Sequence, residues 1–330
     1  MTIWRGQDRA IAALLGAIDA ERLHHAWLLG GAMGLGKGGL AREFAKLLLG
    51  AGKGGSTGGK MPELPIDDPV VRLVDAGTHP DLVVLERLVR EKKKGEEGSL
   101  ARNITVDQIR GLSHFLHLAP SMARRRVVII DTADELERGA ANALLKNLEE
   151  PPRDTIFLLV SHAPGRLLPT IRSRCRFLNF RALSDEDMDA VLASAAPELS
   201  AQARQVLIRG AEGSPGRALA MRHLDMPALV EALTRIAETG DPLNKDRIAL
   251  ARALSPKASQ PRYEAFIDYV PHFIVQRLRA QRDAATAIGT DAWAEAVALG
   301  RGAIAPLQLD PAATVFALCG TVARLAAERV

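Results

Sequence analysis

Three short segments of the sequence are apolar at nearly every position: AWLLG at 26–30, RVVIID at 126–131 and TIFLLV at 155–160. A strand with one face in water would instead alternate apolar and polar residues. Strands that are apolar throughout, separated by segments of helical periodicity, are typical of a parallel sheet covered by helices on both faces. We therefore expect an α/β domain over about residues 1–180.

The segments between these strands complete that pattern. Two further strands are expected at Pro80–Glu86 and Arg176–Phe180, and helices at Ile11–Ala20, Gly39–Leu49, Thr105–Leu118 and Ala133–Glu150. The last of these helices should stop at Pro151 and Pro152, because proline lacks a backbone N–H and clashes with the preceding turn.

The second half of the chain has helical periodicity only. Ser184 and Asp187 have the spacing of a helix-capping box, and the expected breaks between helices are at Pro242, Pro256, Pro271 and Pro306. We predict a small helical domain at residues 181–224 and a larger all-α domain at 225–330.

Composition sets broad limits on the location and partners of the protein. Apolar residues make up 47% of the 330 residues and charged residues 25%, and the formal charge is +4. This mildly basic balance permits work near nucleic acid without demonstrating it. The N-terminal segment lacks a signal-peptide core and no run is long enough to span a membrane. We expect a cytoplasmic protein with no membrane association and with Cys175 and Cys319 as reduced thiols.

The segment GAMGLGKGG, residues 31–39, has most of a phosphate-binding loop. In the pattern G-x-x-x-x-G-K-[ST], backbone N–H groups and a helix N-terminus surround phosphates, lysine adds charge, and a hydroxyl coordinates Mg²⁺. Gly31, Gly34, Gly36 and Lys37 match, but Gly38 stands where the hydroxyl residue belongs. Nucleotide contact is therefore possible in this pattern, and its magnesium ligand is missing.

A second part of a nucleotide site lies at the end of RVVIID. Asp131 takes the position at which phosphate-loop NTPases hold an acid that orients magnesium. Hydrolysing members with a DE pair place a glutamate next, and this chain has Thr132. Asp134 and Glu135 are displaced by two or three residues, so we expect their carboxylates to point elsewhere. Efficient hydrolysis is not expected.

The segment PTIRSRCRF, residues 169–177, places three arginines across one turn. A guanidinium is planar, always charged and forked, which suits contact with a phosphate bound elsewhere. Such an arginine finger, supplied in trans, is worth about 10³–10⁵ in rate. The alternative is that all three arginines are merely solvated.

The segments HHAWLLGGAMGLGKGGLAREFAKLL, VVIIDTADELERGAANALLKNLEEPP and LLPTIRSRC resemble the delta-prime family of bacterial DNA polymerase III clamp-loader subunits, which are AAA+ proteins. The similarity covers about residues 1–220 and is weaker beyond. It implies a RecA-like domain at 1–180, a helical lid at 181–224 and a helical collar at 225–330 through which subunits oligomerise.

The resemblance also implies roles and partners. A member of this family is a stator with little or no ATPase activity, within a DNA-directed DNA polymerase holoenzyme. Its SRC turn, here Ser173, Arg174 and Cys175, directs the arginine into the ATP site of a neighbouring gamma/tau subunit. The other implied partners are the delta subunit and, through the complex, the sliding clamp and primed DNA.

This sequence departs from the family in two respects. Some members carry a four-cysteine zinc module, but GAGKGGSTGGKMPELP has no cysteine, so we predict no zinc. Active members have a lid arginine in a G-S-x-R pattern; here Gly216 takes that position and Arg217 follows. No cofactor is expected to be required, and weak ATP or ADP binding stays open.

Two other functions remain as alternatives. An active AAA+ ATPase motor subunit is compatible with the retained Lys37 and Asp131. A small-molecule phosphotransferase also begins with a strand, a glycine loop and a helix, but such kinases keep the Ser/Thr that Gly38 replaces and lack a long helical C-terminal half.

Overall fold

The chain forms two compact units, Met1–Asp187 and Met188–Val330. A computed structural model describes residues 4–20, 23–50, 61–62, 64–89, 101–280, 287–304 and 310–329. The two units are treated separately below. A further division of the second unit at residue 224 stays a prediction.

The first unit is built on a five-stranded parallel sheet, which confirms the predicted fold class. In spatial order its strands are β2 (Leu82–Leu85), β3 (Arg126–Ile130), β4 (Thr155–Ser161), β1 (Ala26–Gly30) and β5 (Arg176–Asn179). Every residue of β1, β3 and β4 is buried. The apolar segments therefore became central strands because both of their faces are covered by helices.

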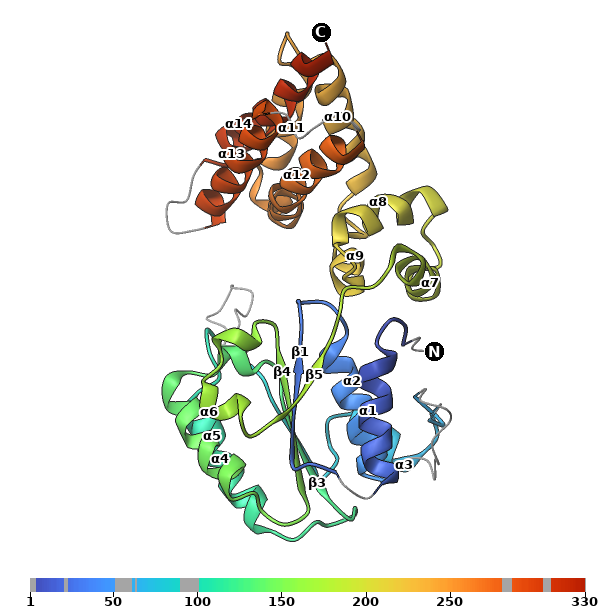
Figure 1. Cartoon of the computed structure of the whole chain (residues 1–330), viewed down its shortest axis with the longest axis vertical. Helices are drawn as coiled ribbons and strands as arrows, with labels where there is room; N and C mark the ends of the chain where they lie inside the picture. The colour runs from blue at the N-terminus through green and yellow to red at the C-terminus, as the bar shows by residue number, and fades with distance from the viewer. Residues whose placement is uncertain are drawn as a thin grey trace. The chain divides into compact units, whose positions relative to one another are not determined.

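Helices lie on both faces of this sheet (Figure 1). One face carries α1 (Asp8–Asp19), α2 (Lys37–Leu48) and α3 (Pro69–Asp75), and the other carries α4 (Val106–His117), α5 (Arg138–Glu149) and α6 (Pro169–Arg172). Thr105 caps α4 as predicted, through a capping box with Gln108. α3 was not predicted from the sequence.

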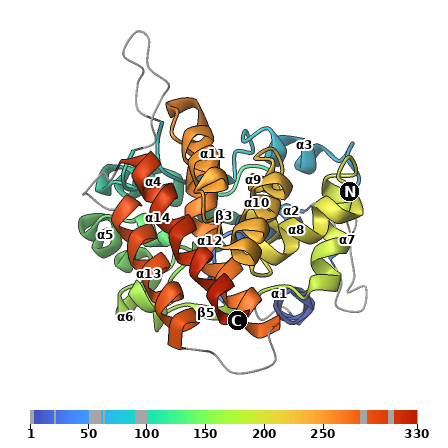
Figure 2. The same cartoon turned by 90° about the horizontal axis from the view of Figure 1, so that it is seen from above.

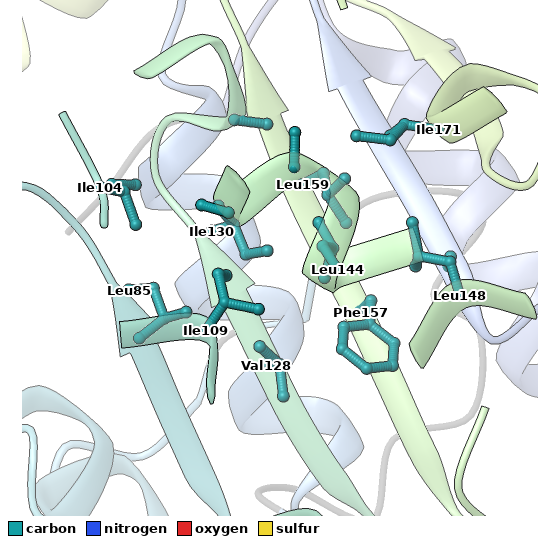
Figure 3. Close-up of a cluster of buried hydrophobic side chains, with 14 of the residues drawn as sticks. Leu85, Ile104, Ile109, Val128, Ile130, Leu144, Leu148, Phe157, Leu159 and Ile171 are labelled. Carbon is teal, nitrogen blue, oxygen red and sulfur yellow. The ribbon is translucent and has the colours of Figure 1, made fainter. Parts of the chain in front are cut away.

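The core between the sheet and α4 and α5 is fully apolar (Figure 3). Val128 and Ile130 of β3 and Phe157 of β4 face helix residues such as Ile109 and Leu144, all at most 1% exposed. Burying a side chain of this size contributes roughly 1.5–3 kcal/mol. This packing fixes where β3 and β4 end, and so where the residues that follow them lie.

The predicted continuous helix Ala133–Glu150 is wrong in its first turn. The chain forms a short 3₁₀ helix, η1 (Ala133–Glu135), and α5 starts only at Arg138. Leu136 between them forms a bridge with Ile104, whose N–H donates to the Glu135 carbonyl and whose carbonyl accepts from the Glu137 N–H. These bonds to a distant segment replace the helical bonds of the first turn.

The second unit is helical throughout its described residues. Its helices are α8 (Ala201–Ala211), α9 (Pro215–Met221), α10 (Met226–Thr239), α11 (Lys245–Leu254), α12 (Gln260–Ala280), α13 (Ala287–Ile304) and α14 (Pro311–Ala323), and α7 (Asp185–Ala195) enters it from the first unit. α11, α12, α13 and α14 pack on one another (Figure 2). None of the helices in the described part of the chain has the length and apolarity needed to cross a membrane.

Pro271 does not break a helix, contrary to the prediction. It lies inside α12, whose buried residues on both sides of it include Phe266, Val270 and Ile274. A proline in a helix loses one backbone hydrogen bond and costs about 3 kcal/mol, and burial of this apolar face offsets that cost. Breaks do occur at Pro242 and Pro256, and Pro306 lies outside the described residues.

Candidate functional site

The glycine loop connects the end of β1 to the start of α2. Gly31, Gly34 and Gly36 have φ values of 152°, 79° and 80°, which residues with a Cβ rarely adopt. The loop therefore has the strand–loop–helix context predicted for it, and its backbone conformation depends on these glycines.

Lys37 turns back onto this loop. Its Nζ donates to the carbonyls of Gly31 at 2.8 Å and Ala32 at 2.6 Å, and the residue is only 2% exposed. Burial lowers the pKa of Lys37 to about 8, and the carboxylates of Asp131 and Asp134 oppose that shift. The ammonium group is thus satisfied by its own loop.

Asp131 follows β3 and lies beside Gly38. A Cβ at Gly38 would lie 2.3 Å from the Asp131 Oδ2 atom, closer than atoms can approach. Arg42 pairs with the same oxygen at 3.7 Å. In this arrangement the carboxylate occupies the space that a Ser or Thr side chain would need, and with glycine at position 38 the loop lacks the hydroxyl that normally coordinates magnesium.

The displaced acids have partners of their own, and Asp134 stays near Lys37, whose pKa its charge raises. Asp134 accepts a hydrogen bond from the Ser161 hydroxyl at 2.8 Å and one from the His162 backbone N–H. Glu135 pairs with Arg87 at 2.9 Å. Neither carboxylate is placed to activate water in the way that the glutamate of a DE pair does.

Two residues beside the loop were missed by the sequence analysis. Ser161 ends β4 and His162 follows it, so both lie at the carboxyl edge of the sheet with Asp131 and the loop. Burial lowers the pKa of His162, and the positive charge of Lys37 lowers it further. Both could have been found from the sequence, because they follow the predicted strand at 155–160 and side chains at the carboxyl ends of parallel strands form the ligand-binding edge.

Trp4 was also missed. Its indole packs on the glycine loop, since a Cβ added to Gly36 or to Gly39 would lie 3.1 Å from a ring carbon. The indole therefore covers the surface formed by the last glycine of the loop and the first turn of α2. Nothing in the spacing of the sequence connects Trp4 to residues more than thirty positions away.

Arg174 lies in the turn between α6 and β5. Its guanidinium pairs with Glu149 at 2.7 Å and donates to the Thr170 carbonyl at 2.9 Å and to the Ser173 hydroxyl at 3.4 Å. The side chain is 33% exposed. On either side of it, Ile171 is buried and Cys175 packs against the core. The turn thus has an anchored base and an accessible cation.

Arg174 and the glycine loop lie at opposite ends of the sheet. β5 is parallel to β1, and Arg176 at the start of β5 pairs with Trp27 near the start of β1. The glycine loop follows the other end of β1, and the rise from Trp27 to Gly31 alone is about 13 Å at 3.3 Å per residue. Arg174 precedes Arg176, so its distance from the loop of its own chain is greater still.

Two further positions that the sequence singled out are Arg217 and Cys175. Arg217 in α9 pairs with Glu212 at 3.1 Å and with Asp268 of α12 at 3.6 Å. Burial raises the pKa of Cys175 to about 12, so its thiol is not poised as a nucleophile. The segment in which a zinc module was considered lies largely outside the described residues.

Comparison with known proteins identifies the family to which the chain is similar. The family model described as "DNA polymerase III, delta subunit" matches residues 6–184. The DNA polymerase III subunit delta′ of Pseudomonas aeruginosa is 37% identical over 225 residues, which are 68% of this chain and 63% of the relative. The Escherichia coli subunit delta′ is 34% identical over 69% of this chain and 64% of its own length.

Other similarities are broader. The tau subunit of E. coli DNA polymerase III is 33% identical over 66% of this chain, but over only 31% of its own length. The chain thus spans less than two thirds of these relatives. A gamma subunit-related protein from Thermotoga maritima has a similar fold, with a TM-score of 0.50 at 16% identity, over 96% of this chain and 99% of that one.

Proposed function

Because the chain belongs to the DNA polymerase III delta-subunit family of clamp-loader proteins, we propose that it is a delta-prime subunit that completes a neighbour's ATP site. In this role it assembles with gamma/tau and delta subunits, and the complex loads the sliding clamp onto primed DNA. Arg174 is the group that it contributes.

The observation that carries this proposal is the placement of Arg174. An accessible guanidinium on an anchored turn, at the end of the sheet opposite the chain's own glycine loop, suits contact with a phosphate on another molecule. Ser173 and Cys175 belong to the same turn. The Ser173 hydroxyl accepts a hydrogen bond from Arg174, and the Cys175 side chain packs against the hydrophobic core.

The state of the chain's own glycine loop supports a stator. Gly38 supplies no hydroxyl, Asp131 fills the adjacent space, and Lys37 is bonded to loop carbonyls. Gly31, Gly34 and Gly36 keep the loop conformation, and Thr132 replaces the glutamate that activates water. We expect no zinc requirement and at most weak ATP or ADP binding.

The decisive experiment is DNA-stimulated ATP hydrolysis by the reconstituted complex. Arg174→Ala should lower turnover at the completed site by about 10³–10⁵, while Arg172→Ala, which removes an exposed arginine two residues away, should leave it unchanged. Equal turnover in the Arg174→Ala and unchanged complexes would refute the finger role.

The alternative is an ATPase motor subunit, favoured by the retained Lys37 and Asp131. On that view the isolated protein hydrolyses ATP and Lys37→Ala abolishes the activity. The stator proposal expects no turnover by the isolated chain and no effect of Lys37→Ala in the complex beyond its effect on folding.

A further inference from the structure

Arg174 has acceptors on α6, on the turn that follows it and at the end of α5. One terminal nitrogen pairs with the Glu149 carboxylate at 2.7 Å, and the other donates to the Thr170 carbonyl and the Ser173 hydroxyl. The guanidinium is thus folded back onto α6 and the end of α5. A phosphate on a neighbouring subunit would compete with the charged acceptor, Glu149, for this side chain.

Carboxylate and phosphate are competing ligands for a guanidinium. Both accept charge-assisted hydrogen bonds from a guanidinium, so extension of Arg174 toward a phosphate on another subunit exchanges one charged acceptor for another. The Glu149 side chain is 49% exposed and that of Arg174 is 33% exposed. Water screens such a pair, so it is weak enough to exchange.

The position of Glu149 favours its pair with Arg174. It is the last residue of α5, where the helix dipole disfavours a negative charge. Glu150 follows it with the same charge and an exposed side chain. Arg174 therefore stabilises the end of α5 when it is retracted, and a phosphate of higher charge draws it away.

We propose that Glu149 is a positioning residue that holds Arg174 in a retracted arrangement, and that ATP in the adjoining subunit releases it by exchanging phosphate for carboxylate. This inference rests on the proposed function of Arg174. Arg174 then has two arrangements, one paired with Glu149 and one extended toward the neighbouring subunit. The strength of the pair with Glu149 sets the fraction of complexes in which the arginine is extended.

The test uses Glu149→Gln in the reconstituted complex, with Glu150→Gln as the matched control for loss of a charge. The expected result is a two- to five-fold rise in kcat/KM for ATP with Glu149→Gln, the range of an exposed ion pair, and no such rise with Glu150→Gln. Raising the salt concentration should reduce the difference in kcat/KM between Glu149→Gln and the unchanged complex, because salt screens an exposed ion pair. A merely structural role of Glu149 would lower the rate, and equal rates in the two variants or a lower rate in Glu149→Gln would overturn the proposal.

A second measurement separates this inference from the proposed function. A double-mutant cycle of Glu149→Gln and Arg174→Ala, read by denaturant unfolding of the isolated chain, should show coupling between the two residues that Glu150→Gln and Arg174→Ala lack. If Arg174→Ala leaves the ATPase unchanged, the proposed function fails whatever the cycle shows. If Arg174→Ala abolishes the ATPase but the cycle shows no coupling, only the retraction by Glu149 fails.

Discussion

The Asp131 carboxylate lies where a side chain at Gly38 would begin, since a Cβ at position 38 would lie 2.3 Å from Asp131 Oδ2 and the carboxylate would have to turn away. The absence of a side chain at position 38 is therefore what allows the Asp131 carboxylate to take its present position. Restoring a serine at 38 would not restore a magnesium site unless the Asp131 side chain moved.

This relationship predicts an unusual response to Gly38→Ala. Replacing a helical glycine by alanine normally stabilises by about 0.5–1 kcal/mol, and Gly16→Ala in α1, where a Cβ meets no atom within 4 Å, should do so. Gly38→Ala should lose about 1 kcal/mol of this gain, because the Asp131 carboxylate has to turn away from Arg42 to make room for the Cβ. In an Asp131→Ala background the penalty should vanish. Urea unfolding of the four variants measures this, and equal stabilisation by Gly16→Ala and Gly38→Ala would contradict it.

Trp4 supplies a second prediction, on nucleotide binding. Its indole covers Gly36 and Gly39, and displacing such an aromatic contact costs about 1–2 kcal/mol. Trp4→Ala should therefore strengthen binding of a fluorescent ADP to the isolated chain by about tenfold. Trp293→Ala, which removes a partly exposed indole from α13, is the control. Equal affinities of both variants and the unchanged protein would show that Trp4 does not restrict the loop.

Lys37 predicts a specific dependence of stability on pH. Its pKa falls from 10.5 to about 8 on folding because it is buried. Between these values the unfolded chain binds more protons than the folded chain, so the free energy of unfolding rises with pH, by at most about 3.4 kcal/mol. Below pH 8 the cost of burying the cation is fully present.

The matched variant for this prediction is Lys37→Met. Burial also raises the pKa of Cys175 and Cys319 to about 12, which lowers stability above pH 9 in both proteins alike. The difference in free energy of unfolding between the unchanged protein and Lys37→Met, followed against pH, therefore reports the titration of Lys37. This difference should change steadily from pH 8 to about 10.5. Parallel curves for the two proteins would show that folding does not shift the pKa of Lys37.

The sequence was a good guide to the strands and a poor one to short-range irregularities. β1, β3 and β4 were predictable because full burial requires apolar residues at every position. α3 was overlooked although Asp68 and Pro69 form a capping signal at its start. The four-residue α6 is too short to show any periodicity, and the break at Leu136 depends on Ile104, far away in the sequence.

The site was predictable in its motifs but not in its contacts. Gly31, Gly36, Lys37 and Asp131 were identified from spacing alone. The pair of Arg174 with Glu149 and the packing of Trp4 on the loop depend on tertiary structure that brings separate segments together. Spacing identifies which residues can do the chemistry; folding decides what each of them touches.

The last prediction concerns Cys175, which follows Arg174 and would be a reactive thiol if the guanidinium controlled it. Burial dominates and raises its pKa from 9.0 to about 12, which lowers the thiolate fraction at neutral pH by about a thousandfold. In a Cys319→Ala variant, which leaves one thiol in the chain, iodoacetamide should label the folded protein about a thousand times more slowly than the protein unfolded in urea. Mass spectrometry of timed samples measures both rates. Labelling of the folded chain at the rate of a free cysteine would show that the turn is open, and that Arg174 lacks the anchored base on which its reach toward a neighbour depends.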